Sequence, residues 1–314
     1  MKKTILGAAV AVLMSTAAHA ENIGVTMALF DDNFLTVLRN GIQDLADGMD
    51  GVDVQIEDAQ NDVAKQLDQI NNFIASGVDA IVVNPVDTSA TQAMSAAAEA
   101  AGVPLVYVNR EPINVDTLPN NQAFVASNEV ESGTLQTLEV CRLLKEAGKT
   151  EADIYVMMGE LSNQAAVQRT KDIHDVMASG NCGVTLNIVD EQTANWSRDE
   201  AQDLMTNWLS TGTQFDAVIS NNDEMAIGAI QALKANGISM ADVIVGGIDA
   251  TQDALVAMQA GDLDVTVFQD AHGQGSGALD AALKLAKGED VDQKVYIPFQ
   301  LVTPQNIDNF LSKN

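Results

Sequence analysis

Polar and aromatic side chains recur in this chain directly after short apolar segments of the kind that form β-strands. The set comprises Asp32, Phe34, Asn109, Arg110, Asn163, Arg169, Trp196, Asn222, Asp249 and Gln269. Guanidinium groups donate hydrogen bonds, carboxylates accept them and amides do both. Together these groups can satisfy a polyol, in which each hydroxyl donates once and accepts twice. The aromatic rings would pack against the apolar C–H faces of such a ligand.

Each of these residues also has a simpler structural explanation when it is taken alone. Asp32 or its neighbour can cap the helix expected to begin near Phe34, and Asp223 can cap a later helix. Arg110 and Arg169 can be surface ion-pair partners. Their shared position favours binding instead, because ligands of parallel sheets lie at the carboxyl ends of the strands.

The segments that must position these side chains alternate between strand and helix patterns. Short continuous apolar segments such as DAIVVN predict strands buried on both faces. We expect strands at 22–28, 52–56, 79–84, 103–108, 124–126, 153–158, 184–189, 215–220, 243–247, 265–268 and 296–302. Apolar residues at helical spacing predict helices at 34–48, 63–75, 89–101, 133–146, 164–177, 198–209, 224–235 and 275–286.

This alternation is typical of α/β proteins, because βαβ units cross over right-handed and form parallel sheets covered by helices. The strands are too many for one sheet, and the alternation is interrupted near Asn128. A length of 314 residues also suggests two domains. We therefore predict two doubly wound lobes, each with a parallel sheet.

Composition and charge exclude several classes of protein. The chain has 16 Lys and Arg against 44 Asp and Glu, a net charge of −28. Nucleic acid and an anionic membrane surface would both repel it. A hydrophobic share of 46% excludes wholesale disorder. The candidate set contains no nucleophile–base pair, metal-ligand spacing or Gly-rich phosphate loop, so we expect no catalytic centre, metal or cofactor.

The N-terminus has the pattern of a cleavable export signal. Two lysines precede an apolar segment at 5–13, and the sequence AHA at 18–20 suits a signal peptidase. We predict a signal peptide over residues 1–20, cleavage after Ala20 and a periplasmic protein. No later segment is long and apolar enough for a membrane helix.

The chain has two cysteines, Cys141 and Cys182. In an oxidising compartment they can form one disulfide. They can equally be two separately buried thiols. Their separation along the chain does not decide between these alternatives.

Over essentially its whole mature length, the chain resembles the periplasmic sugar-binding proteins of ABC importers, of the ribose/galactose type. The segments that carry the resemblance are FDDNFLTVLRNGI, DAIVVNPVD, VPLVYVNRE, AVQRT, SNNDEMAIGAIQAL and VGGIDATQDAL. The resemblance implies two lobes that close on the ligand like a hinged clamp. It places three crossover strands near Ser127, Gln269 and Phe299.

The resemblance also implies that each lobe is discontinuous in sequence. The N-terminal lobe would comprise 21–126 and 270–298, and the C-terminal lobe 127–269 and 299–314. Neither boundary follows from composition or periodicity.

In the N-terminal lobe, the resemblance implies that Asp32 accepts from a ligand hydroxyl and Phe34 stacks on the ring. Asn109 and Arg110 match a polar pair that grips ring hydroxyls. Ribose binders usually have Asp-Arg at this pair and a second Phe where this chain has Leu35. Asp32 and Asn109 look more like the hexose binders, whereas Arg110 does not fit them cleanly.

In the C-terminal lobe, the residues that match the family's polar set are Arg169, Asn222, Asp249 and Gln269. Trp196 matches its stacking aromatic ring, and Asn163 matches a ligand-contacting residue of some hexose binders. VNRE together with ELSNQAAVQRT looks most like the inositol and rhizopine binders. We therefore rank myo-inositol or a close cyclitol first, a hexose such as glucose or galactose second and a pentose third.

The resemblance implies a solute-binding protein that delivers a small neutral polyol to an ABC transporter permease and acts as a monomer. A chemoreceptor is a further candidate partner. Two other classes stay open. An exported polyol-acting enzyme would use carboxylates such as Asp32, Glu111 and Asp249. The sensor core of a sugar-responsive repressor shares the fold, but the export signal and the missing helix-turn-helix disfavour it.

Overall fold

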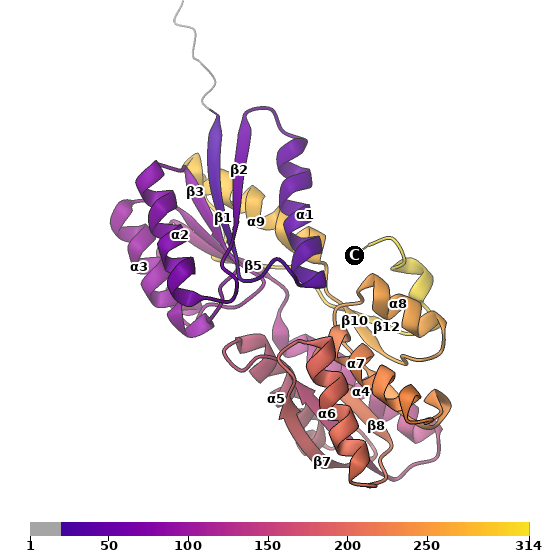
Figure 1. Cartoon of the computed structure of the whole chain (residues 1–314). Coiled ribbons are helices and arrows are strands. Elements are labelled where there is room, and N and C mark those ends of the chain that lie inside the picture. Colours follow the sequence, from indigo (N-terminus) through magenta and orange to yellow (C-terminus); the bar gives the residue numbers. More distant parts are fainter. Residues whose placement is uncertain (1–19, 314) are drawn as a thin grey trace, which may run out of the picture.

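The structure, a computed structural model, describes residues 20–313. Apart from Ala20, the expected signal peptide lies outside the described residues. Figure 1 shows two lobes stacked on one another and joined by several chain segments. Within residues 20–313, no helix combines the length and apolar character needed to cross a membrane.

The N-terminal lobe is built on a six-stranded parallel sheet in the order β11-β5-β4-β3-β1-β2. Its strands are β1 (Glu21–Met27), β2 (Val52–Asp58), β3 (Ala80–Val83), β4 (Leu105–Val108), β5 (Gln122–Ala126) and β11 (Lys294–Tyr296). Its helices are α1 (Asn33–Asp47), α2 (Val63–Ser76), α3 (Thr91–Ala101) and α9 (Ala271–Ala286), with the 3₁₀ turns η1 (Thr88–Ala90) and η2 (Val115–Thr117).

Side chains of β3 and β4 alternate between two cores, one on each face of this sheet. Val82 and Val106 pack with α1 and α9. Ile81 and Tyr107 pack with α2 and α3. All residues of both strands are buried, as the continuous apolar pattern predicts for strands covered on both faces.

The C-terminal lobe contains a four-stranded parallel sheet in the order β7-β6-β8-β9. Its strands are β6 (Glu151–Met158), β7 (Thr185–Thr193), β8 (Ala217–Ser220) and β9 (Ile244–Gly246), and β10 (Thr266–Phe268) pairs with β12 (Gln300–Val302). Its helices are α4 (Glu129–Glu146), α5 (Gln164–Ser179), α6 (Arg198–Ser210), α7 (Asp223–Ala235) and α8 (Gln252–Gln259), with η3 (Met240–Asp242) and η4 (Ile307–Asn309).

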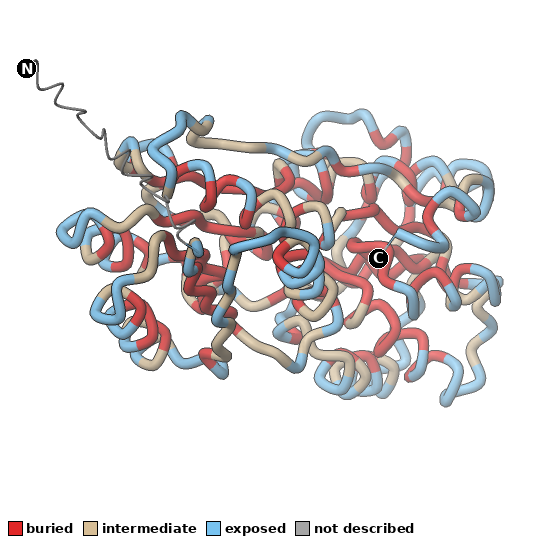
Figure 2. The backbone as a smooth tube through the Cα atoms, turned by 90° about the horizontal axis from the view of Figure 1, so that it is seen from above, coloured by how far each residue is buried: buried red, intermediate tan, exposed pale blue. Residues whose placement is uncertain are grey.

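Helices cover both faces of this second sheet as well. Residues of α4 and α5 form one core with the sheet, and residues of α6, α7 and α8 form the other. Figure 2 shows the buried segments running through the interior of the molecule and the exposed ones in its outer turns. The predicted fold class, two doubly wound lobes with parallel sheets, is therefore confirmed.

The chain passes between the lobes three times. It crosses from β5 to α4, from β10 to α9 and from β11 to β12. Ser127, Gln269 and Phe299 lie in these three connections. The exact residue limits of the lobes stay a prediction.

Four sequence predictions of elements need correction. The segment 296–302 is not one strand, because it divides into β11 and β12, which belong to different sheets. Pro298 lies between them and has no N–H to donate to a ladder. β12 runs antiparallel to β10, whereas only parallel strands were expected. The sequence pattern also did not predict α8. The helix expected to start at 133 begins at Glu129. The prediction placed its start too late because the first turn buries polar side chains and therefore lacks the apolar spacing of a helix.

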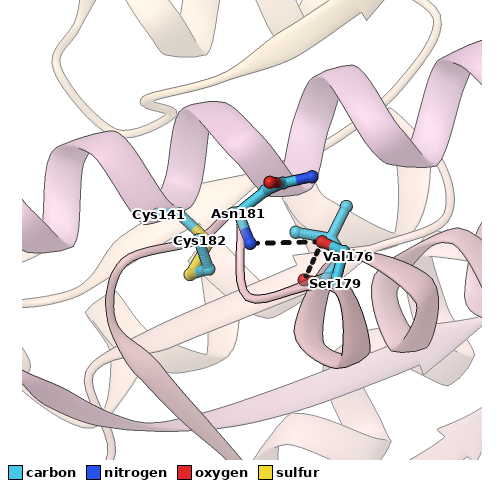
Figure 3. Close-up of a disulfide and its surroundings, with 5 residues drawn as sticks. All are labelled: Cys141, Val176, Ser179, Asn181 and Cys182. Atoms are coloured by element: carbon cyan, nitrogen blue, oxygen red, sulfur yellow. Dashed lines mark hydrogen bonds between the residues drawn. A yellow bond between two sulfur atoms is a disulfide. The ribbon is translucent and has the colours of Figure 1, made fainter.

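The two cysteines form a disulfide, which decides between the two alternatives. Cys141 of α4 is bonded to Cys182, which follows α5, and their Cα atoms are 5.1 Å apart (Figure 3). Beside it, the Ser179 hydroxyl donates to the Val176 carbonyl at 2.9 Å at the end of α5. The bond closes a loop with a sequence separation of 41, which corresponds to a stabilisation of about 4 kcal/mol from chain entropy.

Candidate ligand-binding site

One cavity between the lobes is lined by all ten residues of the predicted set. They are Asp32, Phe34, Asn109, Arg110, Asn163, Arg169, Trp196, Asn222, Asp249 and Gln269, joined by Leu35 and Ala165. The cavity has an empty volume of about 390 Å³, a figure that includes space open to solvent. It lies where the loops after the parallel strands of both sheets meet, as expected for doubly wound sheets.

Asp32 follows β1 and has two roles. Its Oδ1 accepts a hydrogen bond from the Leu35 N–H at 2.7 Å, so it caps α1. Burial raises its pKa, although the Leu35 hydrogen bond and the charge of Arg110 act in the opposite direction. Helix capping and cavity lining are therefore compatible here, because a carboxylate has room for several donors.

Arg110 is buried, with 5% of its surface exposed. Its Nη1 donates to the backbone carbonyls of Pro85 and Val86 at 3.1 and 3.2 Å. Within the described part of the chain it forms no ion pair. Burial lowers its pKa, although the charges of Glu160 and Asp32 act to raise it. The remaining guanidinium N–H groups are available to a ligand.

Asn109 occupies a backbone conformation that few residues tolerate. Its φ is 66°, in the left-handed region where asparagine is enriched. Its Nδ2 donates to Gln274 Oε1 at 3.2 Å, and its Oδ1 accepts from Asn84 Nδ2 at 3.4 Å. The side chain is therefore held from behind while it lines the cavity.

Arg169 is the centre of a buried polar cluster in the C-terminal lobe. Its Nε and Nη2 donate to the Glu129 carboxylate at 2.8 and 3.1 Å, and Nη2 also donates to Gln269 Oε1 at 3.0 Å. Its Nη1 donates to the Asn221 carbonyl at 2.8 Å and lies 3.6 Å from Asp249 Oδ1. Burial acts to lower its pKa, but the two carboxylates outweigh burial and the pKa is raised.

Asp249 lies in a tight turn that a second aspartate supports. The φ angles of Asp249 and Ala250 are 125° and 52°, which cost energy for residues other than glycine. Asp223 Oδ2 accepts from the Thr251 N–H at 2.9 Å, and its Oδ1 accepts from the Thr266 hydroxyl at 2.7 Å. Burial raises the pKa of Asp223 to about 7 and that of Asp249 well above its usual value.

Two asparagines line the cavity from helix starts. Asn163 Oδ1 accepts from the Ala165 N–H at 3.1 Å and caps α5, and Asn222 Oδ1 accepts from the Met225 N–H at 3.0 Å and caps α7. The expectation that Asp223 caps this helix is wrong, because Asn222 is the cap. Both caps use the amide oxygen, so the NH₂ donors can serve a ligand.

Trp196 follows β7 and packs closely against the backbone. A Cβ at Gly159 would lie 2.2 Å from its ring, so only glycine allows this contact. The Arg169 guanidinium lies 5.6 Å from the ring centroid. Within the described residues, the buried indole N–H of Trp196 has no hydrogen-bond partner, and it is a candidate donor to a ligand hydroxyl.

The two lobes contact one another on both sides of the cavity. Asn33 Nδ2 of α1 donates to Glu224 Oε1 of α7 at 2.8 Å. The backbone N–H and the hydroxyl of Thr88 both donate to the Ser162 carbonyl, at 3.1 and 3.0 Å. These contacts hold the lobes in a closed arrangement.

The sequence interpretation missed one central residue, Glu129. It is buried and accepts from both Arg169 and the Ser132 hydroxyl. It follows β5 by three positions, so the position rule that found the other residues applies to it as well. The expected helix start at 133 placed it in a connection and concealed this signal.

The chain matches the family model described as the periplasmic binding protein domain over residues 23–290. It belongs to the periplasmic binding protein family. The resemblance inferred from the sequence motifs is therefore confirmed.

Individual relatives extend this result to the whole length of this periplasmic binding protein. It is 68% identical, over 100% of both chains, to a Rhizobium meliloti protein that carries the name of a rhizopine-binding protein. An ABC transporter solute binding protein from Bacillus halodurans with bound myo-inositol has 42% identity and a TM-score of 0.88, over 96% of this chain and 100% of the other. A Caulobacter myo-inositol binding protein with bound myo-inositol has 28% identity and a TM-score of 0.81, over 92% and 95%.

Proposed function

We propose that this periplasmic binding protein captures a small neutral polyol between its lobes and delivers it to an ABC transporter permease. The observation that carries the proposal is the cavity between the lobes, where donors and acceptors from both lobes converge with two aromatic rings. In this proposal the ligand is chemically unchanged, so the protein is a binder and not an enzyme.

The cavity offers what a ring of hydroxyls requires. Arg110 and the Trp196 indole provide N–H donors, and Asp32 provides acceptor lone pairs. A buried polar group without a partner costs about 1–3 kcal/mol. Because several cavity groups keep unused hydrogen-bonding capacity, a ligand with many hydroxyls gains most from this site.

The ligand we favour is myo-inositol or a close cyclitol. Two solved neighbours hold myo-inositol, and the Rhizobium meliloti relative carries the name of a rhizopine binder. A hexose such as glucose or galactose ranks second and a pentose third. All three are neutral rings with hydroxyls around an apolar face, so they differ mainly in stereochemistry.

Capture would follow from lobe closure. A ligand that bonds to Arg110 on one side and to Asp249 on the other makes its full set of contacts only in the closed form, and it therefore shifts the equilibrium toward that form. The contacts of Asn33 with Glu224 and of Thr88 with Ser162 would support closure without touching the ligand.

Several finer points belong to the same proposal. We infer export with cleavage after Ala20 and a monomeric protein in the periplasm. We also infer that a chemoreceptor is a second partner that binds the closed form. The lobes would comprise 21–126 with 270–298 and 127–269 with 299–314.

The test is calorimetric titration of residues 21–314 with myo-inositol, glucose, galactose and ribose, followed by NMR of the recovered ligand. We expect the tightest binding for myo-inositol and an unchanged spectrum. Absence of binding to every polyol would contradict the proposal. Formation of a new product would favour the alternative of an exported enzyme.

A further inference from the structure

A buried chain of amides lies behind Asn109, on the side away from the cavity. Gln274 of α9 is fully buried and does not line the cavity. Its Oε1 accepts from Asn109 Nδ2 at 3.2 Å, and its Nε2 donates to the Ser127 hydroxyl at 3.0 Å. Ser127 lies in the first crossover between the lobes. Gln274 therefore connects Asn109, which lines the cavity, to the first crossover between the lobes.

The orientation of an asparagine amide is decided by the partners of its oxygen and nitrogen. For Asn109, the second partner is Asn84, whose Nδ2 donates to Asn109 Oδ1 at 3.4 Å. Asn84 is itself oriented by backbone groups, since its Oδ1 accepts from the Ala28 N–H at 3.3 Å and its Nδ2 donates to the Val108 carbonyl at 3.2 Å. Both neighbours therefore favour the same orientation of Asn109.

Gln274 is itself held firmly in place. The next residue, Gly275, allows α9 to touch α1, because a Cβ there would lie 2.0 Å from the Leu38 carbonyl oxygen. This close approach leaves α9 little room to shift. The backbone that carries the Gln274 side chain is thus held by the packing of two helices.

We propose that Gln274 is a positioning residue that sets the orientation of the Asn109 amide toward the ligand. The inference rests on the proposed function, because it assumes a polyol in the cavity. With one N–H engaged by Gln274 and one lone pair by Asn84, Asn109 presents its other N–H and lone pair to the ligand in fixed directions. Such preorganisation improves affinity because less side-chain freedom is lost on binding.

The test is a double-mutant cycle with myo-inositol titrated into residues 21–314. Gln274→Met removes both polar atoms at similar length, and we expect about tenfold weaker binding. In the Asn109→Ala background the same change should alter affinity by less than about twofold, since the coupled partner is gone. Gln274→Glu keeps an acceptor toward Asn109 and should bind within about threefold of the unaltered protein.

Ser127→Ala provides a second route to the same question if Gln274→Met does not fold. It releases Nε2 of Gln274 without touching Asn109, and we expect about threefold weaker binding that again disappears in the Asn109→Ala background. Circular dichroism and thermal unfolding identify which variants are folded.

Equal losses in both backgrounds would overturn the inference, because they would place the effect in the hinge or the fold. Unchanged affinity in Gln274→Met and Ser127→Ala would overturn it as well. If the unaltered protein binds none of the polyols, the proposed function fails and the inference falls with it. If the unaltered protein binds and the cycle shows no coupling, only the inference fails.

Discussion

The two buried arginines of the cavity are held in different ways by the two lobes. Arg169 of the C-terminal lobe bonds to the Glu129 carboxylate, lies near Asp249 and has a raised pKa. Among the described residues, Arg110 of the N-terminal lobe bonds to two backbone carbonyls and to no side chain, and its pKa is lowered. Their exposed fractions are nearly equal, 4% and 5%, so burial does not explain the difference.

The difference indicates that the two halves of the site have different tasks. The C-terminal half is preassembled, because Arg169 is already paired with a carboxylate of the protein. The N-terminal half is incomplete, because Arg110 forms no ion pair in the described part of the chain and the charges of Glu160 and Asp32 do not outweigh its burial. A ligand that supplies acceptors to Arg110 therefore gains most of its binding free energy from the N-terminal lobe. Its presence favours closure of the two lobes.

The largest effect should come from Arg169→Met. The substitution leaves buried carboxylates without their partner, so we expect the free energy of unfolding to fall by about 3–5 kcal/mol and ligand binding to be lost. Urea unfolding and calorimetry measure the two effects. Lys284→Met is the control, since Lys284 and its partner Asp280 are both exposed, and for such a pair we expect less than about 1 kcal/mol. Equal losses in the two variants would contradict the account.

The disulfide belongs to the preassembled half, because it joins α4, which carries Glu129, to the segment that follows α5, which carries Arg169. Replacing Cys141 and Cys182 by serine should lower the free energy of unfolding by about 4 kcal/mol, since the unfolded chain regains the freedom of the closed loop. Affinity for the ligand should change little. Urea unfolding of both proteins measures the stability effect, and calorimetry the affinity. A large loss of affinity in a folded variant would show that the bond positions the site directly.

Arg110→Met tests the incomplete half. We expect binding to weaken by roughly 10- to 100-fold, because hydrogen bonds from a charged group to the ligand are lost. The free energy of unfolding without ligand should stay within about 1 kcal/mol of the unaltered protein, since Arg110 forms no ion pair with a carboxylate in the described part of the chain. A destabilisation as large as that of Arg169→Met would remove the proposed difference between the halves.

A pH-dependent effect should come from Asp172 on α5. Its Oδ1 accepts from Gln168, its Oδ2 has no partner among the described residues, and burial raises its pKa to about 7. The folded state therefore holds a proton between about pH 4 and 7 that the unfolded state releases. The free energy of unfolding should therefore fall as the pH rises through this window, by at most about 1.4 kcal/mol per pH unit.

Asp172→Asn removes this contribution. Urea unfolding at pH 4.5 and 7.5 should show a smaller loss of stability for the variant than for the unaltered protein. Asp223, whose pKa is also about 7, contributes with the same sign to both proteins and so cancels in the comparison. An identical pH dependence of the two proteins would contradict the assignment.

The ten cavity residues could be found from sequence because their position after a strand is a local feature, and parallel strands then bring them together. Glu129 obeys the same rule but was missed, since its polar helix turn carries no apolar spacing. The sequence pattern did not reveal the division between β11 and β12, because two short strands that follow one another closely give the pattern of a single strand. The Cys141–Cys182 bond and the bonds of Gln274 depend on which helices pack together, and spacing along the chain does not specify that.

The central claim is tested most directly by a crystal structure of residues 21–314 grown with myo-inositol. The account predicts one polyol ring between Phe34 and Trp196, with its hydroxyls bonded to Arg110 on one side and to Asp249 on the other. An ordered polyol bound elsewhere, or a closed cavity without polyol at saturating ligand, would contradict it.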